Sequence, residues 1–135
     1  MKRYLDCSAS DLADIGKADL LYAIRASEGR ILVSETIAVT QPLLNNVTNA
    51  ELAASQGADL LLLNLFDVDQ PHIAGLPADV PPQEALRTLQ RLTGRVIGVN
   101  LEAVDPAFAT EHNDFWQMTA GRAATAENEI GRAHV

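Results

Sequence analysis

The sequence predicts an α/β fold with a parallel sheet. Apolar runs of strand length alternate with segments that begin with helix caps, in the order strand, helix, strand, helix, strand. Strands joined through helices are parallel, and their crossover connections are right-handed. An open doubly wound sheet would carry a glycine-rich loop after its first strand. Residues 35–46 contain no glycine, so we expect about three βα units from the N-terminal part of a (β/α)8 TIM barrel, a fold of about 250 residues.

Residues 1–29 are expected to form an N-terminal helical segment. Hydroxyl side chains around Ser8 can cap a short helix. A longer helix is expected over residues 18–26, because apolar residues share one helical stripe there. These residues are Leu20, Leu21 and Ile24. We expect this stripe to be buried and the helix to pack on the N-terminal face of the barrel.

The barrel domain is expected over residues 30–128 and contains the three strands. The first strand spans residues 30–36 and is rich in apolar and β-branched side chains. The second spans residues 58–66 and lacks polar alternation, which is typical of a parallel strand covered on both faces. The third spans residues 95–100.

Two helices are expected to connect these strands. Thr48 and Glu51 form a capping box, in which each side chain accepts a hydrogen bond from the other residue's amide. Pro81 and Pro82 open the second helix. The residues of this helix expected to face the core are Leu86, Leu89 and Leu92.

The composition excludes two classes of protein. A chain of 135 residues with a net charge of −8 has no basic face for nucleic acid. No run approaches the roughly 20 apolar residues that cross a membrane. The acidic residue Asp6 precedes any apolar stretch, which does not suit a secretory signal, and the single Cys7 has no disulfide partner. We therefore expect a cytoplasmic protein.

Polar side chains follow each predicted strand, at the end where ligands bind in parallel α/β folds. They are Ser34 and Glu35 after the first strand, Asn64, Asp67 and Asp69 after the second, and Asn100 and Glu102 after the third.

The carboxylates among these residues suggest acid-base chemistry and a metal. Glu35 ends an apolar run, where desolvation would raise its pKa and suit it to catalysis, and Glu102 is the second acid-base candidate. An ion pair of Glu35 with Arg30 or Arg95 is the alternative. The spacing of Asp67 and Asp69 suits oxygen ligands of Mg²⁺, or else the two residues cap a polar turn before Pro71.

The remaining candidates are neutral or isolated. Ser34, Asn64 and Asn100 can hydrogen-bond substrate oxygens, and for the two asparagines bonds inside the barrel are the alternative. His72 suits either a base or loop packing. Cys7 lacks a neighbouring His and is a weak nucleophile candidate. The aromatic pair Phe115 and Trp116 in the third loop suits a lid or an anchor.

Several segments of the chain resemble a bacterial (β/α)8-barrel family of undefined activity. The resemblance covers nearly all residues up to Asn128 and is carried by residues 6–11, 24–30, 34–35, 47–51, 57–59 and 64–67. Members of that family are loosely labelled phosphoenolpyruvate phosphomutase-like or haloacid dehalogenase-like. Phosphoenolpyruvate mutases bind Mg²⁺ through an aspartate pair followed by a glycine-tyrosine-glycine loop. Here the residues after Asp69 are Gln70, Pro71 and His72.

The segment 129–135 is expected to be a non-native tail. Residues 130–135 back-translate in frame to a common short-read sequencing adapter followed by a stop codon, and Glu129 would be the junction. On this interpretation the chain is an N-terminal fragment, inactive alone, of a longer protein.

The functional hypothesis follows from the fold and the site. We expect the parent to be a lyase or mutase acting on a small anionic metabolite, phosphorylated or carboxylated, with Mg²⁺ as cofactor and a homo-oligomeric assembly. The alternative is a non-catalytic barrel that binds or senses a metabolite through Asn64 and Asn100.

Overall fold

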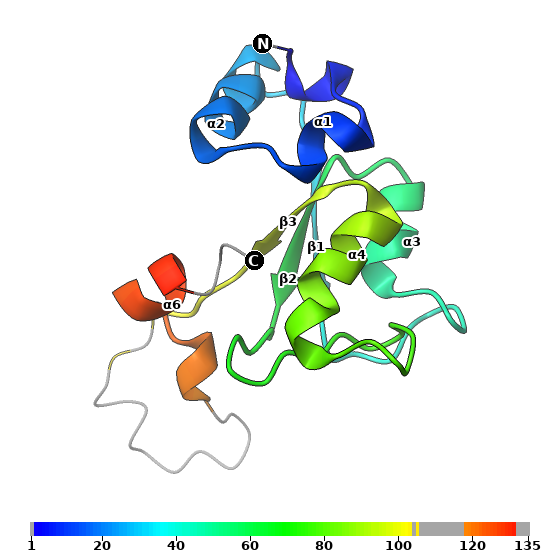
Figure 1. Cartoon of the computed structure of the whole chain (residues 1–135), viewed down its shortest axis with the longest axis vertical. Helices are drawn as coiled ribbons and strands as arrows, with labels where there is room; N and C mark the ends of the chain where they lie inside the picture. The colour runs from blue at the N-terminus through cyan, green and yellow to red at the C-terminus, as the bar shows by residue number, and fades with distance from the viewer. Residues whose placement is uncertain (1, 104, 106–117, 132–135) are drawn as a thin grey trace.

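The computed structural model describes residues 2–103, 105 and 118–131. Its centre is a three-stranded sheet of β1 (Val33–Ile37), β2 (Leu60–Asn64) and β3 (Val96–Val99), in the order β1-β2-β3 (Figure 1). Both strand pairs are parallel. The predicted α/β class and the parallel sheet are therefore confirmed. The strands are shorter than expected, and β1 begins later and ends one residue beyond the predicted segment.

Two helices connect the strands, as the caps predict. Helix α3 (Asn49–Ser55) begins with the capping box, where the Glu51 amide donates to Thr48 Oγ1 over 3.1 Å and the Thr48 amide donates to Glu51 Oε2 over 2.9 Å. A short 3-10 turn, η2 (Pro82–Glu84), leads into α4 (Ala85–Thr93). Gly94 then ends α4 in the left-handed conformation.

Helices α3 and α4 cover the same face of the sheet (Figure 1). Leu61 and Leu63 of β2 and Leu89 of α4 are fully buried there. Ala85 and Leu86 also join this core, but Leu92 is 48% exposed. The expectation that Leu92 faces inward is wrong, because this residue in the last turn of α4 leaves nearly half of its surface exposed.

The opposite face of the sheet carries apolar side chains that no described helix covers. Pairing aligns Val33 with Leu60 and Val96, and Glu35 with Leu62 and Gly98. Side chains of paired residues in parallel strands point to the same face. Val33 is 51% exposed, because it lies on this uncovered face.

The N-terminal segment contains η1 (Tyr4–Asp6), α1 (Ala9–Ala13) and α2 (Lys17–Ala26). Tyr4, Leu12 and Ala23 form a second core that contacts Val96 at the start of β3. The Tyr4 hydroxyl donates to the Asp59 carbonyl over 2.7 Å and accepts from the Val96 amide over 3.4 Å. Burial raises the pKa of Tyr4. The segment thus packs at the end of the sheet where β2 and β3 begin.

The buried stripe of α2 differs from the predicted one. Leu20 and Ile24 contact the second core, but Leu21 is 45% exposed. Ala23 and Ser27 are buried instead. Residues 20, 23, 24 and 27 share one face of a helix, and position 21 lies about 100° from position 20. The prediction for Leu21 is therefore wrong.

We expect Tyr4→Phe to lower the free energy of unfolding by about 1–3 kcal/mol, because the Asp59 carbonyl and the Val96 amide lose a partner in a buried place. Urea unfolding followed by circular dichroism measures the change. Leu21→Asp is the matched control and should change stability by no more than about 0.5 kcal/mol, as surface substitutions usually do. An equal loss in both variants would contradict this packing.

A second prediction concerns acid stability. Lys2 Nζ lies 2.7 Å from Asp11 Oδ2, and this hydrogen bond lowers the pKa of Asp11 well below its usual range. A lowered pKa in the folded state adds stability above the ordinary value near 4, and that stability is lost as pH falls further. Asp11→Asn should therefore flatten the dependence of stability on pH below about 4. Asp79→Asn, at an exposed residue, should leave that dependence unchanged in acid-unfolding curves.

Candidate functional site

Two asparagines meet at the carboxyl end of the sheet. Asn64 is the last residue of β2, and Asn100 directly follows β3, where its amide donates to the Leu63 carbonyl over 2.9 Å. Asn100 Nδ2 donates to Asn64 Oδ1 over 3.4 Å. Both side chains are half-buried. The structure thus brings together two of the predicted substrate-binding residues.

The backbone after Asn64 is strained. Leu65 has a φ of 55°, in the left-handed region that non-glycine residues rarely adopt. Its amide donates to Asn64 Oδ1 over 2.8 Å, so the Asn64 side chain stabilises this turn. Strain of this kind persists only where surrounding contacts enforce it, and it is concentrated at functional sites.

Asp67 stabilises the next turn of the chain. Its Oδ1 accepts hydrogen bonds from the amides of Asp69, over 2.8 Å, and Gln70, over 3.1 Å. This arrangement matches the alternative interpretation, in which Asp67 caps a turn before Pro71. Asp69 is exposed at the surface of the same turn.

A C-terminal segment covers this turn. The 3-10 helix η3 (Ala120–Arg122) places the Gly121 carbonyl 3.1 Å from the Val68 amide, which donates to it. A side chain at Gly121 would collide with the Asp67 carboxylate, and its Cβ would lie 2.8 Å from the Asp69 amide nitrogen. The close approach of η3 to the Asp67 turn therefore requires glycine at this position.

Glu102, predicted as an acid-base residue, forms an ion pair with Arg122. The carboxylate Oε1 lies 2.5 Å from Arg122 Nη2, and the two side chains are only 18% and 12% exposed. Backbone bonds strengthen the contact, since the Glu102 amide donates to the Arg122 carbonyl over 2.8 Å. The Glu102 charge is thus neutralised within the described part of the chain.

Asn128 holds the covering segment in place. It lies in α6 (Ala126–Gly131) and is 5% exposed. Its Nδ2 donates to the carbonyls of Ala120 and Ala123, each over 2.8 Å. Gly121, Arg122 and Asn128 are not among the site residues predicted from the sequence. The opposite charges of Glu102 and Arg122 were visible, but no local spacing rule pairs residues so far apart.

Ser34 and Glu35 lie away from this cluster. Because β1 extends to Ile37, both residues are inside the strand rather than at its carboxyl end. Glu35 is exposed on the uncovered face, so the desolvation expected for it is absent. The alternative ion pairs are also absent from the described residues, since Arg30 contacts Glu28 and Arg95 Nε donates to the Ala58 carbonyl. A catalytic role for Glu35 stays a prediction.

The other predicted candidates are His72, Cys7 and the aromatic pair, and none of those that the structure describes joins the cluster at the carboxyl end of the sheet. His72 is exposed in the loop after β2. Cys7 lies at the other end of the sheet, in the N-terminal segment, where Sγ donates to the Arg3 carbonyl over 3.3 Å. Phe115 and Trp116 lie outside the described residues.

The described residues contain no group of three His, Cys, Asp or Glu side chains that could hold a metal ion. Mg²⁺ needs only one or two protein carboxylates when waters and substrate complete its shell. The hydrogen bonds of the Asp67 turn use Oδ1. A site at Asp67 and Asp69 is compatible with that chemistry and stays a prediction.

The architecture defines an α/β protein with a parallel sheet and polar residues at its carboxyl end. None of the helices in the described part has the length and apolar character for crossing a membrane. The chain belongs to the family described as a domain of unknown function, DUF7916, whose model matches residues 5–133. Searches of curated proteins and of solved structures find no match. The family match assigns no activity.

We expect Gly121→Ala to lower the free energy of unfolding by about 1–3 kcal/mol, the usual cost of overpacking, because the new methyl group meets the Asp67 turn. Gly16→Ala is the control, since a Cβ there has no neighbour within 4 Å and φ is −72°. Thermal unfolding compares the two variants. Equal stability of both would show that η3 does not pack on the turn.

Proposed function

We propose that the carboxyl end of the sheet binds a small phosphorylated or carboxylated metabolite. Ligands of parallel α/β folds bind beyond the carboxyl ends of the strands. The observation that carries the proposal is the meeting of Asn64 and Asn100 at this end, beside the strained backbone of Leu65. Their 3.4 Å hydrogen bond is long, so a ligand oxygen could replace it at little cost.

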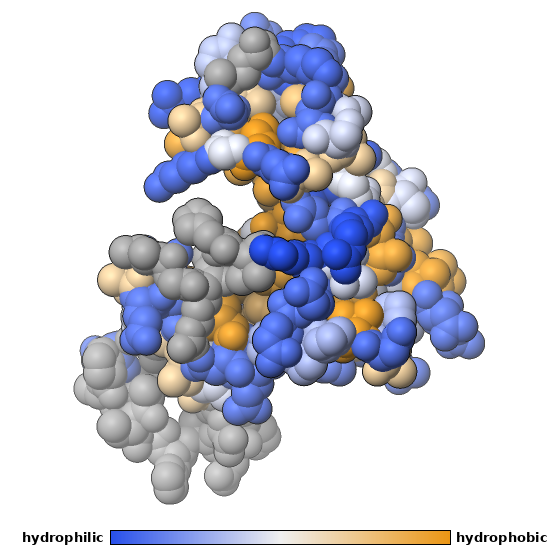
Figure 2. Space-filling view, in the orientation of Figure 1, coloured by the Kyte–Doolittle hydropathy of each residue, from blue (hydrophilic) through white to orange (hydrophobic). Residues whose placement is uncertain are grey.

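We also propose that the sheet belongs to a (β/α)8 barrel. Both connecting helices lie on one face, and the other face is apolar and uncovered in the described part. A cavity of about 550 Å³ lies along Val96–Val99 of β3. Figure 2 shows apolar surface in the hollow below the N-terminal helices, on the side of β3. In a barrel, the uncovered face becomes the interior and a further strand pairs with β3.

The barrel assignment gives Glu35 a place in the site. The carboxylate lies on the face that would become the interior, two residue pairs before the level of Asn64, because Glu35 pairs with Leu62 and Ile37 pairs with Asn64. Enclosure by further strands would remove water from around it, which suits a carboxylate to acid-base catalysis. Ser34 alternates with Glu35 and belongs to the helix-covered face.

Asp67 and Asp69 are the residues that would hold Mg²⁺. When bound, the ion would stabilise negative charge that develops on a phosphoryl or enolate oxygen during lyase or mutase chemistry. The residues of the chain supply the rest: the two asparagine amides orient the substrate, and Glu35 holds or accepts a proton. Glu102, which is ion-paired with Arg122, is the second acid-base candidate.

A second candidate function is metabolite binding without catalysis. One observation favours it: two of the predicted reactive carboxylates already have structural partners. Arg122 neutralises Glu102, and Asp67 Oδ1 accepts two backbone hydrogen bonds. The neutral amides of Asn64 and Asn100 would then form the recognition site.

We expect calorimetric titration with phosphoenolpyruvate, with and without Mg²⁺, to show binding that Asn64→Asp and Asn100→Asp each weaken at least about tenfold, or 1.4 kcal/mol. The added carboxylate repels an anion at nearly constant shape. Gln56→Glu, at the exposed end of α3, adds the same charge and should leave the affinity unchanged.

Turnover distinguishes the two functions. If Glu35→Gln abolishes product formation but retains binding, the protein is an enzyme of the proposed type. Binding without turnover in the complete barrel, rather than in this segment alone, supports the metabolite-binding function instead. Failure to bind phosphoenolpyruvate and a parallel dicarboxylate, malate, would contradict both.

A further inference from the structure

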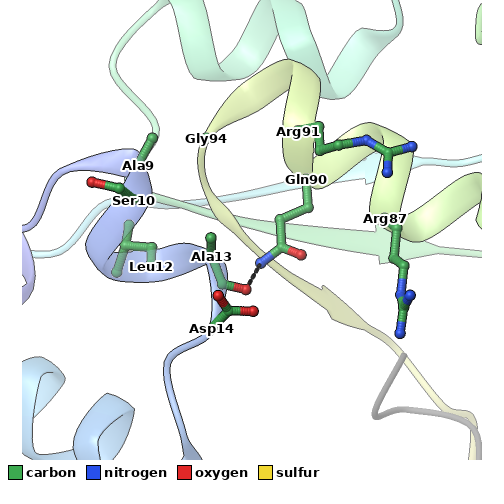
Figure 3. Close-up of a pocket in the computed structure, with 9 residues that line it drawn as sticks. All are labelled: Ala9, Ser10, Leu12, Ala13, Asp14, Arg87, Gln90, Arg91 and Gly94. Carbon is green, nitrogen blue, oxygen red and sulfur yellow. Dashed lines mark hydrogen bonds between the residues drawn. The ribbon is translucent and has the colours of Figure 1, made fainter.

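A second cavity lies between α1 and α4, away from the carboxyl-end asparagines. It has a volume of about 580 Å³, which is within the usual range for small-molecule sites. Ser10 and Asp14 line it from α1 and its C-terminal cap, and Arg87, Gln90 and Arg91 line it from α4 (Figure 3). We refer to it as the α1–α4 cavity. It shares no residue with the asparagine site, but it adjoins the cavity along β3, and both are lined by Leu12, Ala13, Asp14 and Gln90.

Two contacts hold the walls of this cavity together. At one end, Gly94 approaches α1 so closely that an added Cβ would lie 2.8 Å from Ala9 Cβ. Gln90 Nε2 donates to the Ala13 carbonyl over 3.4 Å at the end of α1 (Figure 3). The cavity is therefore formed by two helices in direct contact.

Arg87 is placed unfavourably for helix stability, whereas Arg91 lies in the last turn of α4, where the helix dipole favours a cation. They are four residues apart on α4, where like charges repel one another. Arg87 also lies in the first turn of α4, which has no acidic residue, and the helix dipole disfavours a cation there. Local rules of this kind are typically broken at functional positions.

Neither guanidinium forms an ion pair with a described residue. Arg91 Nη2 donates to the neutral Thr88 hydroxyl over 2.9 Å, and both arginines are exposed. Carboxylates are abundant in this chain, whose net charge is −8. An ion pair within the described residues therefore does not explain why two arginines lie on one helix face beside a cavity.

The guanidinium groups of Arg87 and Arg91 point in different directions, and that of Arg91 is directed away from α1 (Figure 3). We propose that the α1–α4 cavity binds a small ligand through a phosphate group toward which these two exposed side chains turn. A phosphate monoester carries a charge of about −1.5 to −2 at pH 7, which matches two guanidinium groups. Guanidinium forks also donate paired hydrogen bonds to phosphate oxygens. Gln90 and Ser10 add neutral polar groups for the remainder of the ligand.

Asp14 allows a test of whether the ligand is an anion or a cation. Its carboxylate lines the same cavity and would repel a phosphate. Removing that charge should therefore strengthen binding. If the cavity instead took a cation or an amine, the same change would weaken binding.

The experiment is calorimetric titration of the full chain with inorganic pyrophosphate at low ionic strength. We expect saturable binding that Arg87→Gln and Arg91→Gln each weaken at least tenfold, whereas Asp14→Asn strengthens it several-fold. Arg25→Gln, at an exposed arginine in the last turn of α2, removes the same charge elsewhere and should change the affinity less than twofold. Arg87→Lys keeps the charge but not the fork, so its affinity should be intermediate.

Several results would overturn the proposal. They are no saturable binding of pyrophosphate at 10 mM, an equal loss of affinity in Arg25→Gln, and weaker binding in Asp14→Asn. Both cavity arginines are exposed, so their variants should keep the unfolding temperature of the original chain. If the Arg87 and Arg91 variants lose pyrophosphate binding but keep the unfolding temperature, the result supports a phosphate site in the α1–α4 cavity. The result is independent of phosphoenolpyruvate binding at Asn64 and Asn100, because Asn64→Asp should leave the pyrophosphate affinity unchanged.

Discussion

The packing of Leu61 and Leu63 beneath α3 and α4 is the interaction on which the structure depends. These two side chains of the central strand are fully buried, and β2 pairs with both neighbouring strands. Side chains alternate along a strand, so burying positions 61 and 63 directs Leu60, Leu62 and Asn64 to the other face. One hydrophobic contact thereby determines which face is covered and where the polar end of β2 is presented.

The carboxyl end of the sheet is organised by contacts from distant parts of the chain. Gly121 lies on the Asp67 turn, Arg122 neutralises Glu102, and Asn128 holds η3 through two carbonyls. A largely buried ion pair loses the hydration of both charges, so it is stable only where each charge has a well-placed partner. The pairing of Glu102 with Arg122 therefore ties the covering segment to the end of β3, and it limits how freely Glu102 can act as an acid or base.

The opposite end of the sheet is organised by Tyr4. Its hydroxyl bridges the Asp59 carbonyl and the Val96 amide, so the N-terminal segment is tied to the starts of two strands. This anchor also sets α1 against α4, where Gly94 allows the close approach to Ala9. The α1–α4 cavity and the carboxyl-end cluster are thus separate features, produced by the two chain segments that flank the sheet.

The sequence alone determined the elements and their order. Capping residues such as Thr48 and Glu51, the glycine stop at Gly94 and the apolar run of β2 encode local structure within a few residues. It also identified Asn64 and Asn100 as strand-end residues. Only the tertiary structure decided that Leu21 is exposed, that Glu35 lies inside β1, and that Glu102 pairs with Arg122. Local periodicity encodes helices and strands, whereas contacts between segments far apart in the chain follow from how those elements pack.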